Sequence, residues 1–336
     1  MKDLIEAINK EYSEIVTESY GKAHGGYLSE NYIVGGKERK YFLKQYRSHY
    51  SEQDIKNIHK VKKYLSENGI PVVLPINSKN NESFISYNTR YFALFPFIEA
   101  KSIKPEKAST VAVKSMARMQ AKIHLLSRKE LPMIHEKETS VWDGNKALEK
   151  GEILLKIVLN IKKLNKFDKM ALKYIKFKLK LIKANNITPQ SIGLENDHLI
   201  HGDFHGLNLF FDDDDEVKYV FDLEKTVIAP RSYELARAMD YICLNDFNFK
   251  KAGIYLSTYR EIYPMSDVEF RKGFLFYYLK GVHTFWIEEF HYLDNFTRTD
   301  VFYKGDNEKL EHFSEDIDGV IDKIVSSSVV KSHGGQ

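Results

Sequence analysis

The segment LIHGDFHGLNLFF, residues 199–211, holds the side chains best suited to chemistry. Asp203 and Asn208 match the pattern D-x-x-x-x-N, and Asp222 follows 14 residues after Asn208. Transfer of a phosphoryl group to a hydroxyl needs a carboxylate beside that hydroxyl and oxygen ligands for Mg²⁺. The spacing therefore predicts that Asp203 is the catalytic carboxylate, and that Asn208 and Asp222 are metal ligands.

Each of these side chains also has an ordinary structural interpretation. An aspartate after glycine is most often a turn residue. His201 is expected to hold the loop through hydrogen bonds rather than to carry a proton, and His205 to face either substrate or solvent. A zinc site on the two histidines would lack a third ligand at a recognised spacing. Glu224 is expected on the same strand face as Asp222, where it would assist the metal, contact substrate or form a salt bridge.

The elements that must position these residues form two regions. Apolar periodicity predicts a helix over residues 1–19, and a second helix runs from the cap Ser51 to Asn68, with Gly69 as its stop. Strands are predicted at NYIV, KYFLKQY, PVVLPI, SFISY and RYFALFPFIEA. After residue 98 helices dominate, at 108–126, within 146–185 and from Tyr233 onward. LNLFF and VKYVFDL are expected to pair around the acidic turn Asp212–Glu216.

This order predicts an α+β protein with two lobes. Residues 1–98 would form a small lobe of antiparallel sheet plus helix, and residues 99–330 a larger, mainly helical lobe that holds the catalytic segment. A formal net charge of +3 over 336 residues is too small to indicate a nucleic-acid or membrane partner. The single cysteine, Cys243, lies in the apolar run MDYICL and is interpreted as a buried thiol.

The chain shows no signal-peptide pattern at its start and no apolar run of about 20 residues. A cytoplasmic protein is the simplest expectation. Residues 153–185 form a lysine-rich amphipathic pattern that would suit an anionic membrane or nucleic acid. Lysines on the solvent face of a helix explain the same pattern without any partner.

The run from HGDFHGLNLFF to VFDLEKTVIAPRSYELARAM resembles the aminoglycoside phosphotransferase and choline kinase-like family, which shares the protein-kinase fold. Homoserine kinases of the second type and spore-coat kinase-like proteins belong to the same group. The matching positions are His201, Gly202, Asp203, Asn208, Asp222 and the helix start Tyr233, Glu234, Leu235 and Ala236. The family usually has aspartate where Glu234 stands.

The resemblance also assigns a nucleotide site in the first lobe. GGYLSENYIV resembles the turn over the phosphates, with Gly25, Gly26 and Ser29 as backbone donors. Lys44 in YFLKQY matches the lysine of the third strand that binds the α/β-phosphates. LFPFIEA resembles the hinge that binds adenine, at Pro96, Phe97 and Ile98.

One feature of the family is missing from the sequence. The strand lysine is usually paired with a glutamate on the next helix, and SEQDIKNIHKVKKYLSENGI has no glutamate at the expected place. Glu52 and Asp54 lie near the start of that helix, earlier than expected. The resemblance therefore leaves the partner of Lys44 open.

The implied function is a small-molecule kinase that uses ATP, or GTP, with Mg²⁺. It would phosphorylate a hydroxyl of a small acceptor such as an aminoglycoside, an amino alcohol or homoserine, with no nucleic-acid or membrane partner. Aromatic and acidic residues within 281–296 would suit an amine-bearing acceptor, or serve as core. The alternatives are a non-catalytic kinase-like binding or structural protein and a binding module built on the basic helix.

Overall fold

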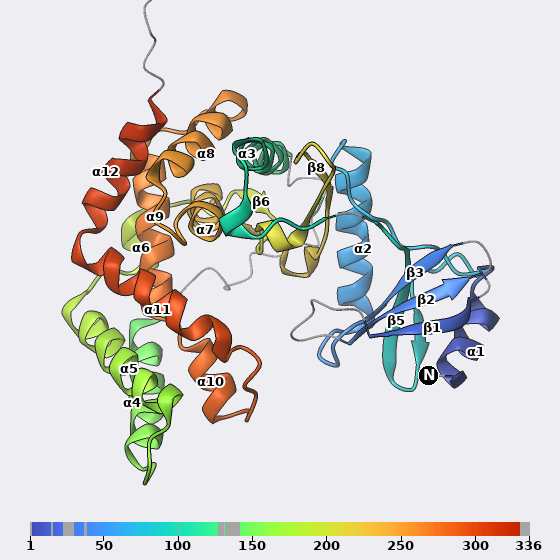
Figure 1. Cartoon of the computed structure of the whole chain (residues 1–336), viewed down its shortest axis with the longest axis horizontal. Coiled ribbons are helices and arrows are strands. Elements are labelled where there is room, and N and C mark those ends of the chain that lie inside the picture. Colours follow the sequence, from blue (N-terminus) through green and yellow to red (C-terminus); the bar gives the residue numbers. More distant parts are fainter. Residues whose placement is uncertain are drawn as a thin grey trace, which may run out of the picture.

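A five-stranded antiparallel sheet with one helix on each side forms the first part of the protein (Figure 1). The computed structural model describes residues 2–14, 16–22, 30–36, 39–99, 101–126, 131 and 142–329. The strands run in the order β1-β2-β3-β5-β4. Their bounds, with those of the two helices, are α1 Lys2–Glu11, β1 Val16–Lys22, β2 Asn31–Gly36, β3 Lys40–Gln45, α2 Glu52–Glu67, β4 Ile85–Tyr87 and β5 Arg90–Pro96.

Strand β3 runs through the middle of the sheet, between β2 and β5. Tyr41 and Leu43 pack with the residues of α1 on one face of the sheet. Side chains alternate between the two faces of a strand, so Lys44 lies on the opposite face, which α2 covers. The fold thereby directs Lys44 toward the second part of the protein.

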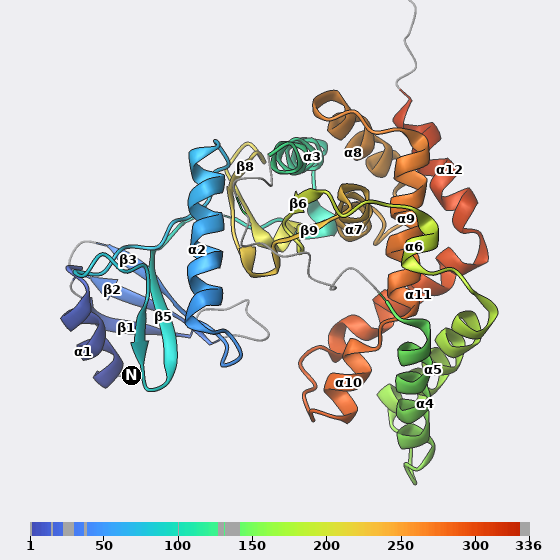
Figure 2. The same ribbon diagram turned by 180° about the vertical axis from the view of Figure 1, so that it is seen from behind.

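Helix α2 joins the sheet to the helical region (Figures 1 and 2). Its N-terminus has a capping box between Ser51 and Asp54, and Gly69 follows its end with a φ of 78°. Ile55 and Ile58 pack into the core of the sheet, whereas the side chains one turn later, such as Val61 and Leu65, join the larger core of the helical region. One face of α2 therefore lies against each half of the molecule.

The second part of the protein is mainly helical, with two short ribbons of antiparallel strands. Its helices are α3 Thr110–His124, α4 Gly144–Leu159, α5 Lys166–Ala184, α6 Pro189–Ile192, α7 Arg231–Cys243, α8 Phe249–Ile262, α9 Asp267–Val282, α10 Trp286–Tyr292, α11 Asp300–Glu315 and α12 Ile317–Ser328. Strands β6 His198–Ile200 and β9 Val227–Ala229 pair, as do β7 Leu209–Phe211 and β8 Val217–Val220. Short 3₁₀ turns occur at η1 Pro105–Lys107, η4 Gly206–Asn208 and η5 Leu223–Lys225.

Most of the predicted elements are confirmed, but two predictions are wrong. PVVLPI forms no strand: only Val72 makes an isolated bridge, to Val220. Pro71 and Pro75 lack the N–H groups that a strand inside a sheet would donate. The first helix ends at Glu11 and a strand begins at Val16, within the range expected to be helical. Among the described residues, no helix is both long and apolar enough to span a bilayer.

Candidate active site

The predicted catalytic loop lies between β6 and η4 and is packed against the segment that follows β8. Gly202 has a φ of 79°, and a Cβ at this position would lie 2.0 Å from the carbonyl oxygen of Lys225. Only glycine fits both the left-handed backbone and this close approach. The loop and η5 are thereby held together, although more than 20 residues of chain separate them.

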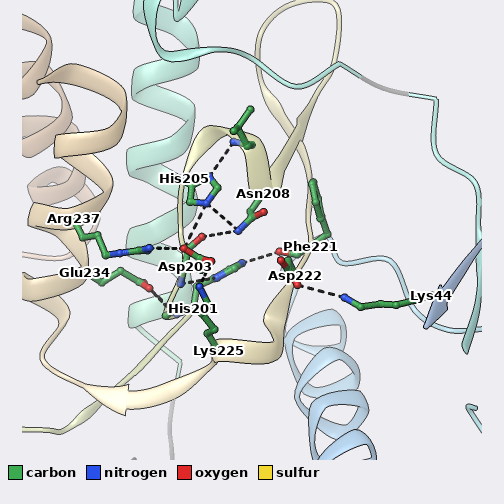
Figure 3. A network of polar contacts seen from close by, with 12 residues as sticks. Lys44, His201, Asp203, His205, Asn208, Phe221, Asp222, Lys225, Glu234 and Arg237 are labelled. Atoms are coloured by element: carbon green, nitrogen blue, oxygen red, sulfur yellow. Dashed lines mark hydrogen bonds and ion pairs between the residues drawn. The ribbon is translucent and has the colours of Figure 1, made fainter. Parts of the chain in front are cut away.

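Asp203 lies in this loop as a buried carboxylate with two close cations (Figure 3). Its oxygens accept hydrogen bonds from Nη2 of Arg237 at 2.5 Å and from Nζ of Lys225 at 2.7 Å. Nε2 of His205 lies 3.5 Å from Oδ1. Burial raises the pKa of Asp203, but Arg237, His205 and Lys225 outweigh it and hold the pKa well below its usual range. Asp203 is therefore ionised at neutral pH and can accept a hydrogen bond from a hydroxyl.

The backbone of the loop is held by Glu234 of α7. The carboxylate of Glu234 accepts hydrogen bonds from the backbone N–H of His201 at 3.2 Å and of Gly202 at 2.5 Å. Its Oε2 also lies 2.9 Å from Nε2 of His124. Three groups thus share this one side chain, in the position where the family usually has the shorter aspartate.

The ring of His201 has a structural role, as the sequence predicted. Its Nε2 lies 2.9 Å from the carbonyl oxygen of Phe221, and its Nδ1 accepts from the backbone N–H of Asp203 at 3.2 Å. Burial lowers the pKa of His201, so the neutral ring is favoured. These two hydrogen bonds tie the loop around Asp203 to the segment that ends at Asp222.

The two predicted metal ligands both border this loop. Nδ2 of Asn208 donates to the carbonyl oxygen of Asp203 at 2.9 Å, and no donor among the described residues is bonded to its Oδ1. Asp222 follows β8 in a left-handed conformation, with a φ of 61°, and begins η5. An amide oxygen and a carboxylate fit Mg²⁺, which usually takes only one or two protein oxygens and completes its shell with phosphate and water.

Lys44 connects the sheet to this segment (Figure 3). Its Nζ lies 3.4 Å from Oδ1 of Asp222 and forms an ion pair with Glu224. Burial lowers the pKa of Lys44, but Glu224 and Asp222 outweigh burial and raise it. The missing partner of Lys44 is thus Glu224 of η5. The expectation that Glu224 shares a strand face with Asp222 is wrong, because β8 ends at Val220 and both residues belong to the turn that follows.

Comparisons with known proteins agree with this geometry. A family model described as the phosphotransferase enzyme family matches residues 21–263, which is more than half of the chain. The chain belongs to this phosphotransferase family. A search of curated proteins by sequence found no match.

Solved structures share the fold of this phosphotransferase at low sequence identity. A spectinomycin phosphotransferase bound to ADP and spectinomycin has a TM-score of 0.61 and 16% identity, over 97% of this chain and 98% of that one. An amicoumacin kinase in complex with AMP-PNP, Ca²⁺ and Ami has a TM-score of 0.62 and 13% identity, over 93% of each chain. A choline kinase from Cryptosporidium parvum Iowa II has a TM-score of 0.60 and 14% identity, over 96% and 97%. The two-lobed kinase-like fold is therefore confirmed.

The remaining predicted nucleotide contacts of the phosphotransferase are only partly visible. Gly25, Gly26 and Ser29 lie outside the described residues. Pro96 ends β5, and the backbone N–H of Phe97 already donates to the carbonyl oxygen of Lys40 at 3.3 Å. The carbonyl of Pro96 and the backbone of Ile98 therefore remain as the predicted adenine-binding groups of the hinge.

The acidic turn and the basic helix, which suggested other functions, form ion pairs within the phosphotransferase itself. In the acidic turn, Asp215 pairs with Lys101 at 2.8 Å. On the basic helix α5, Lys173 pairs with Glu311 at 2.7 Å and Lys183 with Glu152 at 2.9 Å. These ion pairs favour the interpretation of both segments as structural surface.

The acidic residues of α10 are also paired. Glu288 lies 3.4 Å from Nζ of Lys178 and accepts from the hydroxyl of Tyr303 at 3.0 Å. Glu289 pairs with Lys150 at 2.6 Å. The idea that these two carboxylates line an acceptor pocket therefore loses support.

Sequence reasoning overlooked Arg237 and Lys225, the two cations on Asp203. Arg237 stands three residues after Glu234, and side chains at this spacing share one helix face. That spacing would have placed Arg237 beside the loop that Glu234 holds. Lys225 stands three residues after Asp222 in a 3₁₀ turn, and no pattern in the sequence marks its contact with Asp203.

Proposed function

We propose that this protein is a small-molecule kinase that transfers the γ-phosphoryl group of ATP to a hydroxyl of a small, amine-bearing acceptor, with Mg²⁺ as cofactor. The observation that supports it most directly is one network of polar contacts. Asp203, Asn208, Asp222 and Lys44 come from both parts of the fold and meet in this network (Figure 3). Structurally similar proteins bind ADP, or AMP-PNP with Ca²⁺.

Each residue has a distinct task in the proposed reaction. Asp203 orients the acceptor hydroxyl, and Arg237 fixes the carboxylate through its 2.5 Å contact. Asn208 and Asp222 hold Mg²⁺, which neutralises phosphate charge when it is bound. Lys44 interacts with the α/β-phosphates. Most of the acceleration comes from positioning and from charge neutralisation, because phosphoryl transfer requires little covalent work from the protein.

Further backbone contacts complete the proposed nucleotide site. Gly25, Gly26 and Ser29 cover the triphosphate with their N–H groups, and the segment from Pro96 to Ile98 binds the adenine. The first lobe, residues 1–98, thus binds nucleotide, while residues 99–330 carry the catalytic loop and the acceptor site.

An amine on the acceptor is favoured by Asp306 of α11. Burial raises the pKa of this carboxylate, and the side chain forms no ion pair or hydrogen bond with any described residue. Lys309 and, more weakly, Lys178 and Arg237 lower the pKa of this carboxylate, and Arg237 also contacts Asp203 directly. An ammonium group on the acceptor would give this carboxylate a direct ion-pair partner.

A non-catalytic kinase-like protein is the second candidate. The absence of a glutamate on α2 favoured it, but Glu224 supplies a partner for Lys44 and removes much of that argument. A pseudo-enzyme and an active kinase differ in one measurable property, which is phosphoryl transfer.

The test compares wild type with Asp203→Asn, which keeps the shape of the side chain and removes its charge. ADP release is measured against a panel of amino alcohols, aminoglycosides and homoserine. We expect transfer to fall by about 10²–10⁴-fold, with nucleotide affinity nearly unchanged. Asp213→Asn, at an exposed position of the acidic turn, is the matched control and keeps full activity. Activity of Asp203→Asn within about tenfold of wild type contradicts the assigned role.

A further inference from the structure

Helix α2 buries a lysine beside the nucleotide site. Lys62 is only 5% exposed, and its Nζ lies 5.5 Å from the ring centroid of Phe95 on β5. It forms no hydrogen bond or ion pair with any residue that the structure describes. A buried ammonium without a carboxylate partner is costly, so its presence needs a physical explanation.

Charged groups on two other elements act electrostatically on Lys62. Strand β3 contributes Lys44, η5 contributes Glu224, and Asp222 begins that turn, while α2 itself packs against η5. His59 on α2 and the hydroxyl of Tyr46 are bonded to each other at 2.6 Å. Burial and then the charge of Lys44 lower the pKa of Lys62 to about 8, although Glu224 and Asp222 act in the opposite direction.

The four charged side chains differ in depth. The exposed fraction of the side chain is 40% for Asp222, 13% for Lys44 and 9% for Glu224. Lys62 is buried as well, with 5% of the whole residue exposed. Lys44 forms ion pairs with both carboxylates, whereas Lys62 forms an ion pair with neither.

Nucleotide binding would change this balance. Under the proposed function, on which this inference rests, Lys44 interacts with the phosphates and Asp222 with the metal. The ion pair between Lys44 and Glu224 would then weaken. Glu224 is buried, and a buried carboxylate without a cation is strongly unfavourable. Lys62 is a further buried cation that interacts electrostatically with Glu224.

We infer that Lys62 is a positioning residue of the triphosphate site, which pairs with Glu224 when Lys44 turns toward the phosphates. Lys62 thereby fixes the position of Glu224, and Glu224 in turn fixes the position of Lys44. Lys62 acts through Glu224 and not on the nucleotide, because its side chain is buried and packs beside Phe95.

The experiment measures the affinity of the full-length protein for Mg-ATP and for adenosine by calorimetry. Lys62→Met is expected to weaken Mg-ATP binding about tenfold or more and to leave adenosine binding unchanged. Adenosine has no phosphate groups that could interact with Lys44. Lys62→Arg restores most of the affinity. Lys60→Met, the same substitution at an exposed position of α2, is the control and changes neither affinity. A thermal unfolding scan should show Lys62→Met at least as stable as wild type, since it removes a buried charge.

A second measurement tests the route through Glu224. In a Glu224→Gln background, Lys62→Met should have little further effect on Mg-ATP affinity, because the two changes interrupt the same chain of contacts. An undiminished loss in that background shows that Lys62 acts on the phosphates directly and overturns the inference.

Three other results overturn it as well. Equal weakening of Mg-ATP and adenosine by Lys62→Met indicates a packing role beside Phe95. Unchanged Mg-ATP affinity removes any role in the triphosphate site, while the proposed kinase function stands. A wild-type protein that binds no Mg-ATP overturns the proposed function together with the inference.

Discussion

His59 of α2 leads to a quantitative prediction about acid stability. The buried ring lies 2.6 Å from the hydroxyl of Tyr46 through Nε2 and 2.6 Å from the hydroxyl of Ser83 through Nδ1. Burial, and then the charges of Lys62 and Lys44, lower the pKa of His59 from 6.5 to about 3. A positive charge on this ring would lie beside two lysines, so the folded protein keeps it neutral.

The sign of the effect follows from proton binding in the two states. The unfolded chain takes up a proton at His59 below pH 6.5, whereas the folded protein does so only near pH 3. Stability is therefore lost as the pH falls between these values, by about 1.4 kcal/mol for each pH unit. At pH 4 the loss from this one residue reaches about 3 kcal/mol, a large part of the ~5–15 kcal/mol that stabilises most proteins.

The assay is urea unfolding at pH 7 and pH 4, on wild type and on His59→Gln. Glutamine keeps a donor and an acceptor near Tyr46 and Ser83 but does not titrate. Many groups contribute to acid unfolding, so the informative quantity is the difference between the two proteins in the free energy lost. We expect wild type to lose about 3 kcal/mol more than the variant.

A matched control is His312→Gln, at a histidine of α11 whose side chain is 41% exposed, which should lose as much stability as wild type. If His59→Gln and wild type lose the same free energy between pH 7 and pH 4, the reasoning is refuted. The ring would then be able to hold its charge beside Lys44 and Lys62, and the electrostatic description of this face of α2 would fail with it.

Two further predictions concern Glu234, which holds the loop around Asp203, and Asp222, the proposed metal ligand. In Glu234→Gln, the side-chain NH₂ group would face a backbone N–H and could not accept its hydrogen bond. The free energy of unfolding, measured by urea titration, should therefore fall by about 2–4 kcal/mol. The value of kcat should also fall by a larger factor than nucleotide affinity. Unchanged stability would show that the loop does not depend on Glu234. Asp222→Asn should raise the Mg²⁺ concentration needed for half-maximal ATP binding and leave adenosine binding unchanged, as followed by metal titration. An unaltered Mg²⁺ requirement would remove Asp222 from the metal site.

The local chemistry of the sequence determined most of the secondary-structure elements and which candidate site residues share one loop. The capping box at Ser51, the glycine after α2 and the alternating runs around Lys44 are short-range signals, and the structure confirms the helix and strands that they predict. The pattern D-x-x-x-x-N likewise lies within one loop, where spacing alone brings Asp203 and Asn208 together. PVVLPI misled because its β-branched residues outweighed the two prolines that interrupt any ladder of hydrogen bonds.

Only the tertiary structure decided which charges meet. Lys44 and Asp222 are 178 positions apart, and Arg237 reaches Asp203 across 34 positions. The sequence shows that α2 lacks a suitable glutamate, but it does not show that Glu224 of η5 pairs with Lys44 instead. Ion pairs of this kind form over a few ångströms, and the packing of the two lobes around α2 sets those distances. The partners of Lys44, Asp203 and Lys62 therefore follow from the way the lobes pack, and no local pattern contains them.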